Sequence, residues 1–241
     1  MPISPKLLAT GTTGTTVALA PLLAVQGVRV RRSTPRLPGA CGPLTGSVPG
    51  PRPLCLLALG ESTVDGVGAR THEEALTGQL ASALARRWGR GVDWRVAART
   101  GANARTVTAE LLTDACREPA DLVVVALGVN DTIELNSARR YRRDLLALVV
   151  AVRRALGPVP VVLAGVPPLG AFPTLPQPLR LVLGLRGAAL DAAAATLAAL
   201  PGVTHCPVPR AVVQPDLFAP DGFHPGPAGY HLWAEKLAEA V

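Results

Sequence analysis

Three apolar runs, each ending where small and polar residues begin, limit what this chain can fold into. The first covers residues 54–59 and stops at Gly60, and two others cover residues 121–127 and 159–164. Strands of a parallel sheet that is covered on both faces are apolar nearly throughout, and these runs have that length and character. The sequence therefore predicts a buried parallel sheet between two layers of helices.

Segments with helical periodicity separate these runs. In the first segment Leu76, Leu80 and Leu84 recur at helical spacing, and Thr71 is the expected N-cap. Strands that alternate with helices indicate right-handed crossovers and a parallel sheet. We predict an α/β fold of one domain: a three-layer α/β/α, flavodoxin-like arrangement with a five-stranded parallel sheet in the order 2-1-3-4-5. The expected strands are 54–59, 93–98, 121–127, 159–164 and 203–206, and the expected helices are 73–88, 103–115, 137–156, 178–199 and 226–240.

The N-terminal part of the chain differs from the rest. Residues 1–32 form an apolar segment with a basic flank, and residues 33–52, with five prolines and four glycines, are predicted to be a linker without helix or strand. The folded domain is expected to cover residues 53–241.

The apolar N-terminal segment has several possible roles. Its apolar centre, residues 17–25, is too short to span a bilayer alone. It could be a signal region, although Pro21 follows its one Ala-x-Ala and would impede cleavage, or a weak span, or an interfacial anchor, because four arginines follow at once. We expect a cytoplasmic protein, with peripheral membrane contact through residues 7–36, rather than a secreted one. The alternatives of anchor and leader stay open.

Composition narrows the classes of partner. The net charge is +7, with 24 Lys and Arg against 17 Asp and Glu, but no long basic block follows the N-terminal segment. Aromatic residues make up 3% of the chain, which argues against a stacking platform for nucleic acid. Four cysteines, Cys41, Cys55, Cys116 and Cys206, lack metal-ligand spacing. We therefore expect no nucleic-acid partner, no metal and no cofactor, and the sequence leaves the disulfide state and the oligomeric state open.

Small and polar residues follow four of the predicted strands. They are Gly60-Glu61-Ser62, residues 99–103, residues 128–131 and residues 221–225. The carboxyl ends of parallel strands meet at one edge of a sheet, where ligands bind in open α/β folds. The sequence therefore predicts one site built from these loops.

The residue types in these loops suit acyl transfer by a serine. His224 can take the hydroxyl proton of Ser62, and Asp221 can fix the imidazole from three residues away. The backbone N–H groups of Ser62 and Gly101 and the side-chain amide of Asn130 can donate to an oxyanion. Each residue alone is typical of a turn, a cap or the surface. Their conjunction, each after a strand, is what favours a catalytic site.

The four blocks resemble those of the SGNH (GDSL-type) hydrolase family over residues 53–241. They are Gly60-Glu61-Ser62, Gly101, Gly128-x-Asn130-Asp131 and Asp221-x-x-His224, and Glu61 replaces the family's usual aspartate. The resemblance implies a serine esterase with Ser62 as nucleophile, Asp221 and His224 completing the triad, an oxyanion hole at Ser62, Gly101 and Asn130, and no cofactor. We interpret Glu61 as a turn residue.

The substrate implied is a small-molecule or lipid ester with a short or lipid-like acyl group. The apolar loop at residues 165–173 is expected to line the pocket. Two alternatives stay open: an acyltransferase on the same triad, and a non-catalytic binding module tethered to a membrane. The absence of G-x-S-x-G and P-loop motifs argues against an α/β-hydrolase elbow and a nucleotide site. The natural substrate is not determined by the sequence.

Overall fold

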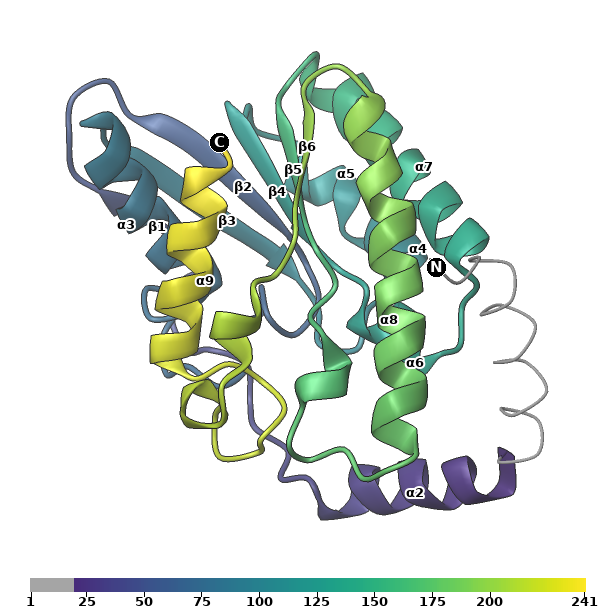
Figure 1. Ribbon diagram of the computed structural model, residues 1–241. Helices are drawn as coiled ribbons and strands as arrows, with labels where there is room; N and C mark the ends of the chain where they lie inside the picture. Colours follow the sequence, from purple (N-terminus) through teal and green to yellow (C-terminus); the bar gives the residue numbers. More distant parts are fainter. Residues whose placement is uncertain (1–19) are drawn as a thin grey trace, which may run out of the picture.

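A computed structural model describes residues 20–241 and shows one central sheet with helices on both faces (Figure 1). The sheet has six strands in the order β1-β3-β2-β4-β5-β6, and the five from β2 onward are parallel. This confirms the predicted three-layer α/β fold and strand order, with one strand more than expected. The strands are β1 (Thr45–Val48), β2 (Leu54–Gly60), β3 (Val92–Ala98), β4 (Leu122–Ala126), β5 (Val161–Ala164) and β6 (Val203–Cys206).

Helices cover both faces of this sheet. α3 and α9 lie on one face, and α4, α7 and α8 lie on the other (Figure 1). The α-helices are α2 (Ala20–Ser33), α3 (Leu76–Trp88), α4 (Ala104–Glu110), α5 (Leu112–Ala115), α6 (Val129–Ile133), α7 (Ala138–Leu156), α8 (Leu179–Ala195) and α9 (Pro227–Glu239). The 3-10 helices are η1 (Leu169–Ala171), η2 (Thr196–Ala199), η3 (Arg210–Val213) and η4 (Pro215–Leu217).

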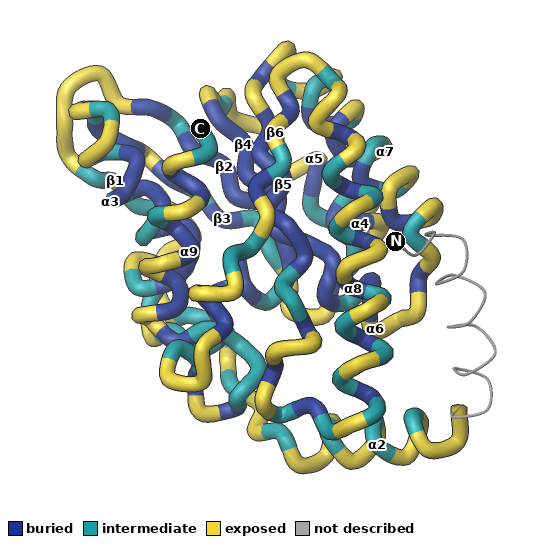
Figure 2. Tube along the Cα trace, in the orientation of Figure 1, coloured by how far each residue is buried: buried dark blue, intermediate teal, exposed yellow. Residues whose placement is uncertain are grey.

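The core is divided by the sheet into two clusters of buried side chains. Leu57 and Leu59 of β2 pack into the cluster under α4, α7 and α8, whereas Leu56 and Ala58 pack into the cluster under α3 and α9. This alternation follows from the two-residue period of a strand. Both faces of β2 are therefore covered by other side chains, and Figure 2 shows the strands at the centre of the molecule as mostly buried.

The extra strand β1 lies inside the segment predicted to be a linker. Its four residues pair antiparallel with β3, from Thr45 opposite Arg95 to Val48 opposite Val92. The prediction that residues 33–52 form no strand was wrong because the prolines flank these four residues and do not interrupt them. Pro is tolerated beside an edge strand. The other boundaries predicted for the N-terminal segment, the linker and the domain stay predictions, and residues 1–19 lie outside the described part of the chain.

Several helix boundaries differ from the predicted ones. α3 begins at Leu76 rather than at residue 73, and Thr71 does not cap it, since the N-cap position is Ala75. Asn103 caps α4 as predicted, because its side chain accepts a hydrogen bond from the Thr106 N–H at 2.9 Å. The segment expected to be one helix to residue 115 is divided into α4 and α5, and the short helix α6 was not expected.

One described helical stretch, Leu179–Ala199, has the length and apolar composition that could cross a membrane. Five residues of α8 are buried in the domain at intervals of three or four, which is the pattern of a helix packed on one side. α8 also packs against α7 and η1, so its position is that of a layer helix of the α/β domain. These five are Leu179, Leu183, Gly187, Leu190 and Ala194.

Candidate active site

The loops after β2 and before α9 bring three predicted residues together. The Oγ of Ser62 lies 2.9 Å from Nε2 of His224, and Nδ1 of His224 lies 2.6 Å from Oδ2 of Asp221. With Nδ1 donating to the carboxylate, the neutral imidazole has Nε2 as its acceptor, and the Ser62 hydroxyl can donate to it. The structure thus assembles the predicted nucleophile, base and orienting acid in one line.

Asp221 is held in its ionised form next to His224. Its side chain is only 1% exposed, and burial by itself disfavours the charge. Hydrogen bonds from the His224 side chain and from the backbone N–H groups of His224 and Phe223 outweigh burial, so the pKa of Asp221 is lowered from its ordinary value. The carboxylate is therefore available to stabilise a protonated His224.

The loop that carries Asp221 and His224 is fixed by its neighbours. The Thr174 hydroxyl donates to the carbonyl oxygens of Asp221 and Gly222, at 3.0 and 2.8 Å. Gly222 has a φ of 62°, and a Cβ built there would lie 2.3 Å from the Thr174 Oγ1. Both the backbone conformation and the close approach require glycine at this position. Thr174, in the loop between β5 and α8, thus supports the segment that carries Asp221 and His224.

The backbone N–H groups of Ser62 and Gly101 are available as donors at this edge. Within the described residues, the N–H groups of Ser62 and Gly101 donate no hydrogen bond to the chain. Gly101 follows β3, the neighbour of β2, and has a φ of 85°. Backbone N–H groups are almost always paired, with protein, water or ligand. These two N–H groups are among those at this edge that donate no hydrogen bond within residues 20–241, and they are the two predicted from the sequence as oxyanion donors.

Asn130, the third predicted donor, is not free in this structure. Its side-chain amide donates to Oε2 of Glu61 and to the carbonyl oxygen of Ala102, at 2.5 and 3.0 Å. An amide nitrogen has two hydrogens, so both already have acceptors. To donate to an oxyanion, Asn130 must share or give up one of these bonds. The sequence did not predict this competition.

Glu61 has a larger role than the turn residue expected from the sequence. Its side chain crosses from the end of β2 to the start of α6, where Oε1 accepts from the Val129 N–H at 2.9 Å and Oε2 accepts from the Asn130 N–H at 3.0 Å. The residue is 3% exposed. Burial raises the pKa of Glu61 from 4.5 to about 7, against the opposing effect of the hydrogen bonds from Asn130 and Val129. Glu61 therefore fixes the Asn130 loop against the nucleophile loop.

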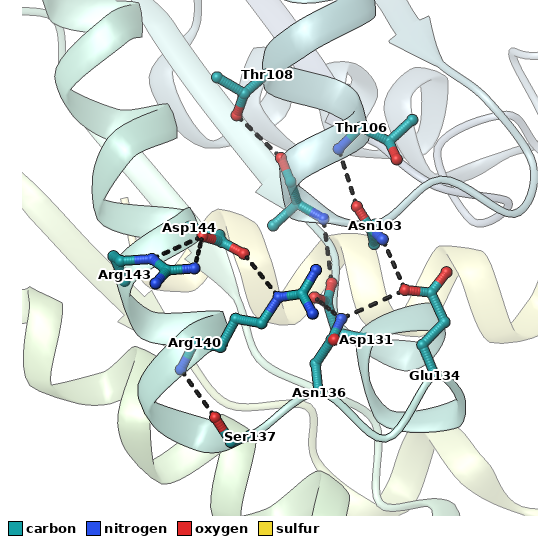
Figure 3. Close-up of polar contacts among 11 residues, drawn as sticks. Asn103, Thr106, Thr108, Asp131, Glu134, Asn136, Ser137, Arg140, Arg143 and Asp144 are labelled. Carbon is teal, nitrogen blue, oxygen red and sulfur yellow. Dashed lines mark hydrogen bonds and ion pairs between the residues drawn. The ribbon is translucent and has the colours of Figure 1, made fainter.

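A polar network, buried at Asp131 and Asn136, fixes the other side of the Asn130 loop (Figure 3). Oδ2 of Asp131 accepts from the Ala104 N–H at 3.1 Å, and Oδ1 accepts from the Asn136 side chain at 2.9 Å. Glu134 accepts from the side chain of Asn103 at 2.6 Å. Burial raises the pKa of Asp131. The network ties the loop that follows Gly101 to the loop that carries Asn130.

These positioning residues were missed by the sequence reasoning. Asp131 was noted only as part of the third block, and Glu134 and Asn136 were not singled out. The available signal was the high proportion of polar residues within 130–136, close behind a buried strand, because polar groups next to the core must find hydrogen-bond partners.

A narrow apolar cavity of about 30 Å³ adjoins Ser62 and His224. Pro167 and Phe172 line it, as expected for the loop at 165–173. The Phe223 ring packs edge-on against both Phe172 and His224, with ring centroids 5.2 and 5.3 Å apart. Other lining side chains come from η3, from the residue that follows η4 and from α9, and they are also apolar: Val212, Val213, Phe218 and Trp233.

Cysteines and the remaining histidines lie outside this site. All four cysteines are free thiols, and the described residues hold no cluster of three metal-ligating side chains. His205 pairs with Asp191 and His231 with Gln79, both at 2.9 Å. His72 is buried.

The fold and the geometry define the class of protein: a three-layer α/β domain whose sheet edge carries a Ser-His-Asp arrangement. The chain belongs to the GDSL-like Lipase/Acylhydrolase family, whose model matches residues 58–232. This membership agrees with the resemblance seen in the sequence.

One curated relative carries the same family description, and solved structures share the fold. The GDSL-like esterase Rv1075c of Mycobacterium tuberculosis is 33% identical over 199 residues, covering 77% of this chain but 61% of the relative. The crystal structure of the lipase Lip_vut3 from a goat rumen metagenome matches with a TM-score of 0.65 at 19% identity, covering 78% of this chain and 97% of that one. An extracellular lipase of Streptomyces rimosus matches with a TM-score of 0.59 at 20% identity, covering 78% and 100%. At these identities the structures show the fold alone.

Proposed function

We propose that this chain is a serine esterase that hydrolyses carboxylic esters through a covalent acyl-enzyme. The observation that carries the proposal is the hydrogen-bonded line from Ser62 through His224 to Asp221, with distances of 2.9 and 2.6 Å. Such a line supplies a base for the hydroxyl proton and a fixed tautomer for the base. Family membership supports the same reaction class.

The chemistry proceeds in two steps on the same residues. Ser62 Oγ attacks the ester carbonyl carbon while its proton passes to Nε2 of His224, and the tetrahedral intermediate expels the alcohol, which takes that proton. A water molecule then attacks the acyl-enzyme and gives its proton to His224. The second intermediate releases the carboxylic acid and returns the proton to Ser62.

The negative charge that develops on the carbonyl oxygen is stabilised by hydrogen-bond donors that already point at this position. The unpaired N–H groups of Ser62 and Gly101 support this role. Asn130 is the third donor, and it acts by exchanging its bond to Ala102 or Glu61 for one to the oxyanion. We propose that Glu61 keeps the Asn130 backbone in place while that exchange occurs.

The size of the apolar cavity supports a short acyl group. The cavity beside Ser62 has a free volume of only about 30 Å³, and its lining is mostly apolar. Longer chains would have to displace the packed rings of Phe172 and Phe218, whose centroids lie 5.2 Å apart. We therefore expect acetyl esters to be better substrates than octanoyl or palmitoyl esters.

The test is hydrolysis of p-nitrophenyl acetate, butyrate, octanoate and palmitate by the purified chain. Ser62→Ala should abolish turnover, and Ser47→Ala, an exposed serine of β1, should leave it unchanged. Acyl chains that appear on an added alcohol in preference to water would overturn hydrolysis in favour of transfer. Full activity of the Ser62→Ala protein would overturn the mechanism.

A further inference from the structure

Helix α2 has one side packed against the domain and one side open to solvent. Leu23 and Val30 pack against the core cluster under α7 and α8. Leu22, Val25 and Val28, spaced three apart, are 45%, 66% and 50% exposed. Figure 2 shows α2 as a largely exposed element on the outside of the domain. An exposed row of apolar side chains on a helix marks an interaction site.

Exposed arginines without acidic partners lie beside this apolar row. Arg29 and Arg32 lie one turn beyond Val25 and Val28, and Arg31 is also exposed. Within residues 20–241 these arginines form no ion pair, and no acidic residue lies between residues 20 and 60. Arginines elsewhere in the domain, such as Arg86 and Arg140, do pair with carboxylates.

Apolar residues beside uncompensated arginines match the chemistry of an anionic bilayer surface. The apolar side chains enter the boundary between headgroups and acyl chains, and the guanidinium groups meet the lipid phosphates. A protein partner with an apolar groove would not require four arginines within eight residues, at positions 29, 31, 32 and 36.

The position of α2 connects this surface to the candidate active site. Gln26 of α2 donates to the carbonyl oxygen of Gln177 at 2.7 Å and accepts from the Leu179 N–H at 3.1 Å. Gln177 belongs to the loop at 165–178 whose Pro167 and Phe172 line the apolar cavity. In Figure 1, α2 lies at the bottom of the view, below the first turn of α8 and beside the loops at the carboxyl edge of the sheet.

We propose that Leu22, Val25, Val28, Arg29 and Arg32, here called the α2 surface, dock the protein onto an anionic phospholipid bilayer. Docking holds the loop at 165–178, and with it the rim of the cavity, next to the membrane. This interaction is independent of the ester chemistry, and binding can be measured without turnover.

The experiment is flotation of the full chain with phosphatidylcholine vesicles, with and without phosphatidylglycerol. We expect binding only to the anionic vesicles and a decline as salt is raised. Arg29→Gln with Arg32→Gln should weaken binding by about 30-fold, since each arginine near an anionic surface contributes roughly fivefold. Val25→Ser with Val28→Ser should weaken it by on the order of tenfold.

Matched controls lie away from the α2 surface. Arg87→Gln with Arg154→Gln removes two exposed arginines near the ends of α3 and α7, and Leu232→Ser removes an exposed apolar residue of α9. Neither should change binding, and circular dichroism checks that every variant is folded. Equal binding to neutral and anionic vesicles, or unchanged binding of the α2 variants, would overturn the proposal. So would a stable dimer that buries the α2 surface and does not bind vesicles.

Discussion

Replacing Glu61 with glutamine tests how the buried carboxylate at the end of β2 supports the site. Glutamine has the same shape but cannot ionise. Burial raises the pKa of Glu61 from 4.5 to about 7. A raised carboxyl pKa stabilises the folded state fully below the unfolded value, and this stabilisation is lost as the pH rises through the folded value. The pH window set by these two values is therefore 4.5 to about 7.

The expected change in the free energy of unfolding follows from the two pKa values of Glu61, 4.5 and about 7. At about 1.36 kcal/mol per pKa unit, the free energy of unfolding of the wild type should fall by about 3 kcal/mol relative to Glu61→Gln across this window. Glutamine also presents an N–H group to the Val129 or Asn130 N–H, which costs about 1–3 kcal/mol at every pH. The variant should thus be less stable than the wild type by about 1–3 kcal/mol at low pH, and equal to it or up to about 2 kcal/mol more stable at high pH.

Urea unfolding of both proteins, at several pH values across this window and on either side of it, measures the difference directly. Other titrating groups are common to the two proteins and cancel to a first approximation. Glu73→Gln, which changes an exposed carboxylate of the same chain, is the control for the loss of one negative charge. A wild-type minus Glu61→Gln difference that does not vary with pH would refute the reasoning about Glu61.

Four further predictions concern the site and its supports. Asn130→Ala should lower kcat for p-nitrophenyl acetate by roughly a hundredfold or more, and an unchanged kcat would exclude Asn130 as an oxyanion donor. Asp221→Asn should lower kcat by on the order of 10⁴-fold, and a loss below tenfold would contradict its role in orienting His224. Activity should fall on acidification because a protonated imidazole cannot accept the Ser62 proton, so a rate that does not fall at acid pH would argue against a histidine base. Gly222→Ala should destabilise the fold by about 1–2 kcal/mol in urea unfolding, because its φ is 62° and Thr174 lies against it; wild-type stability would contradict that.

Much of the sheet was predictable because its strands are buried on both faces. Leu56 and Leu57 point to opposite faces and are both fully buried, so the run 54–59 had to be apolar throughout. Strand β1 was not predictable from apolar pattern because Thr45 and Ser47 of this edge strand are exposed. The late start of α3 was missed because acidic residues near a helix start are compatible with both a turn and a first helical turn.

The candidate site was likewise predictable only in part. Ser62, Asp221 and His224 were predictable because nucleophile, base and acid must be of particular residue types and follow strands. The role of Glu61 was not, since it depends on the distance between the end of β2 and the start of α6. Occupation of both Asn130 amide hydrogens, by Glu61 and Ala102, is likewise a matter of three-dimensional distance.

The central claim is that Ser62 is a nucleophile activated by His224. A fluorophosphonate reacts covalently with an activated serine. Labelling followed by peptide mass spectrometry therefore identifies the reactive serine without any assumption about the substrate. We predict one label per chain, located on Ser62, and strong loss of labelling in His224→Ala and in Ser62→Ala. Absence of labelling in the folded wild type, or a label on another serine that persists in Ser62→Ala, would contradict it.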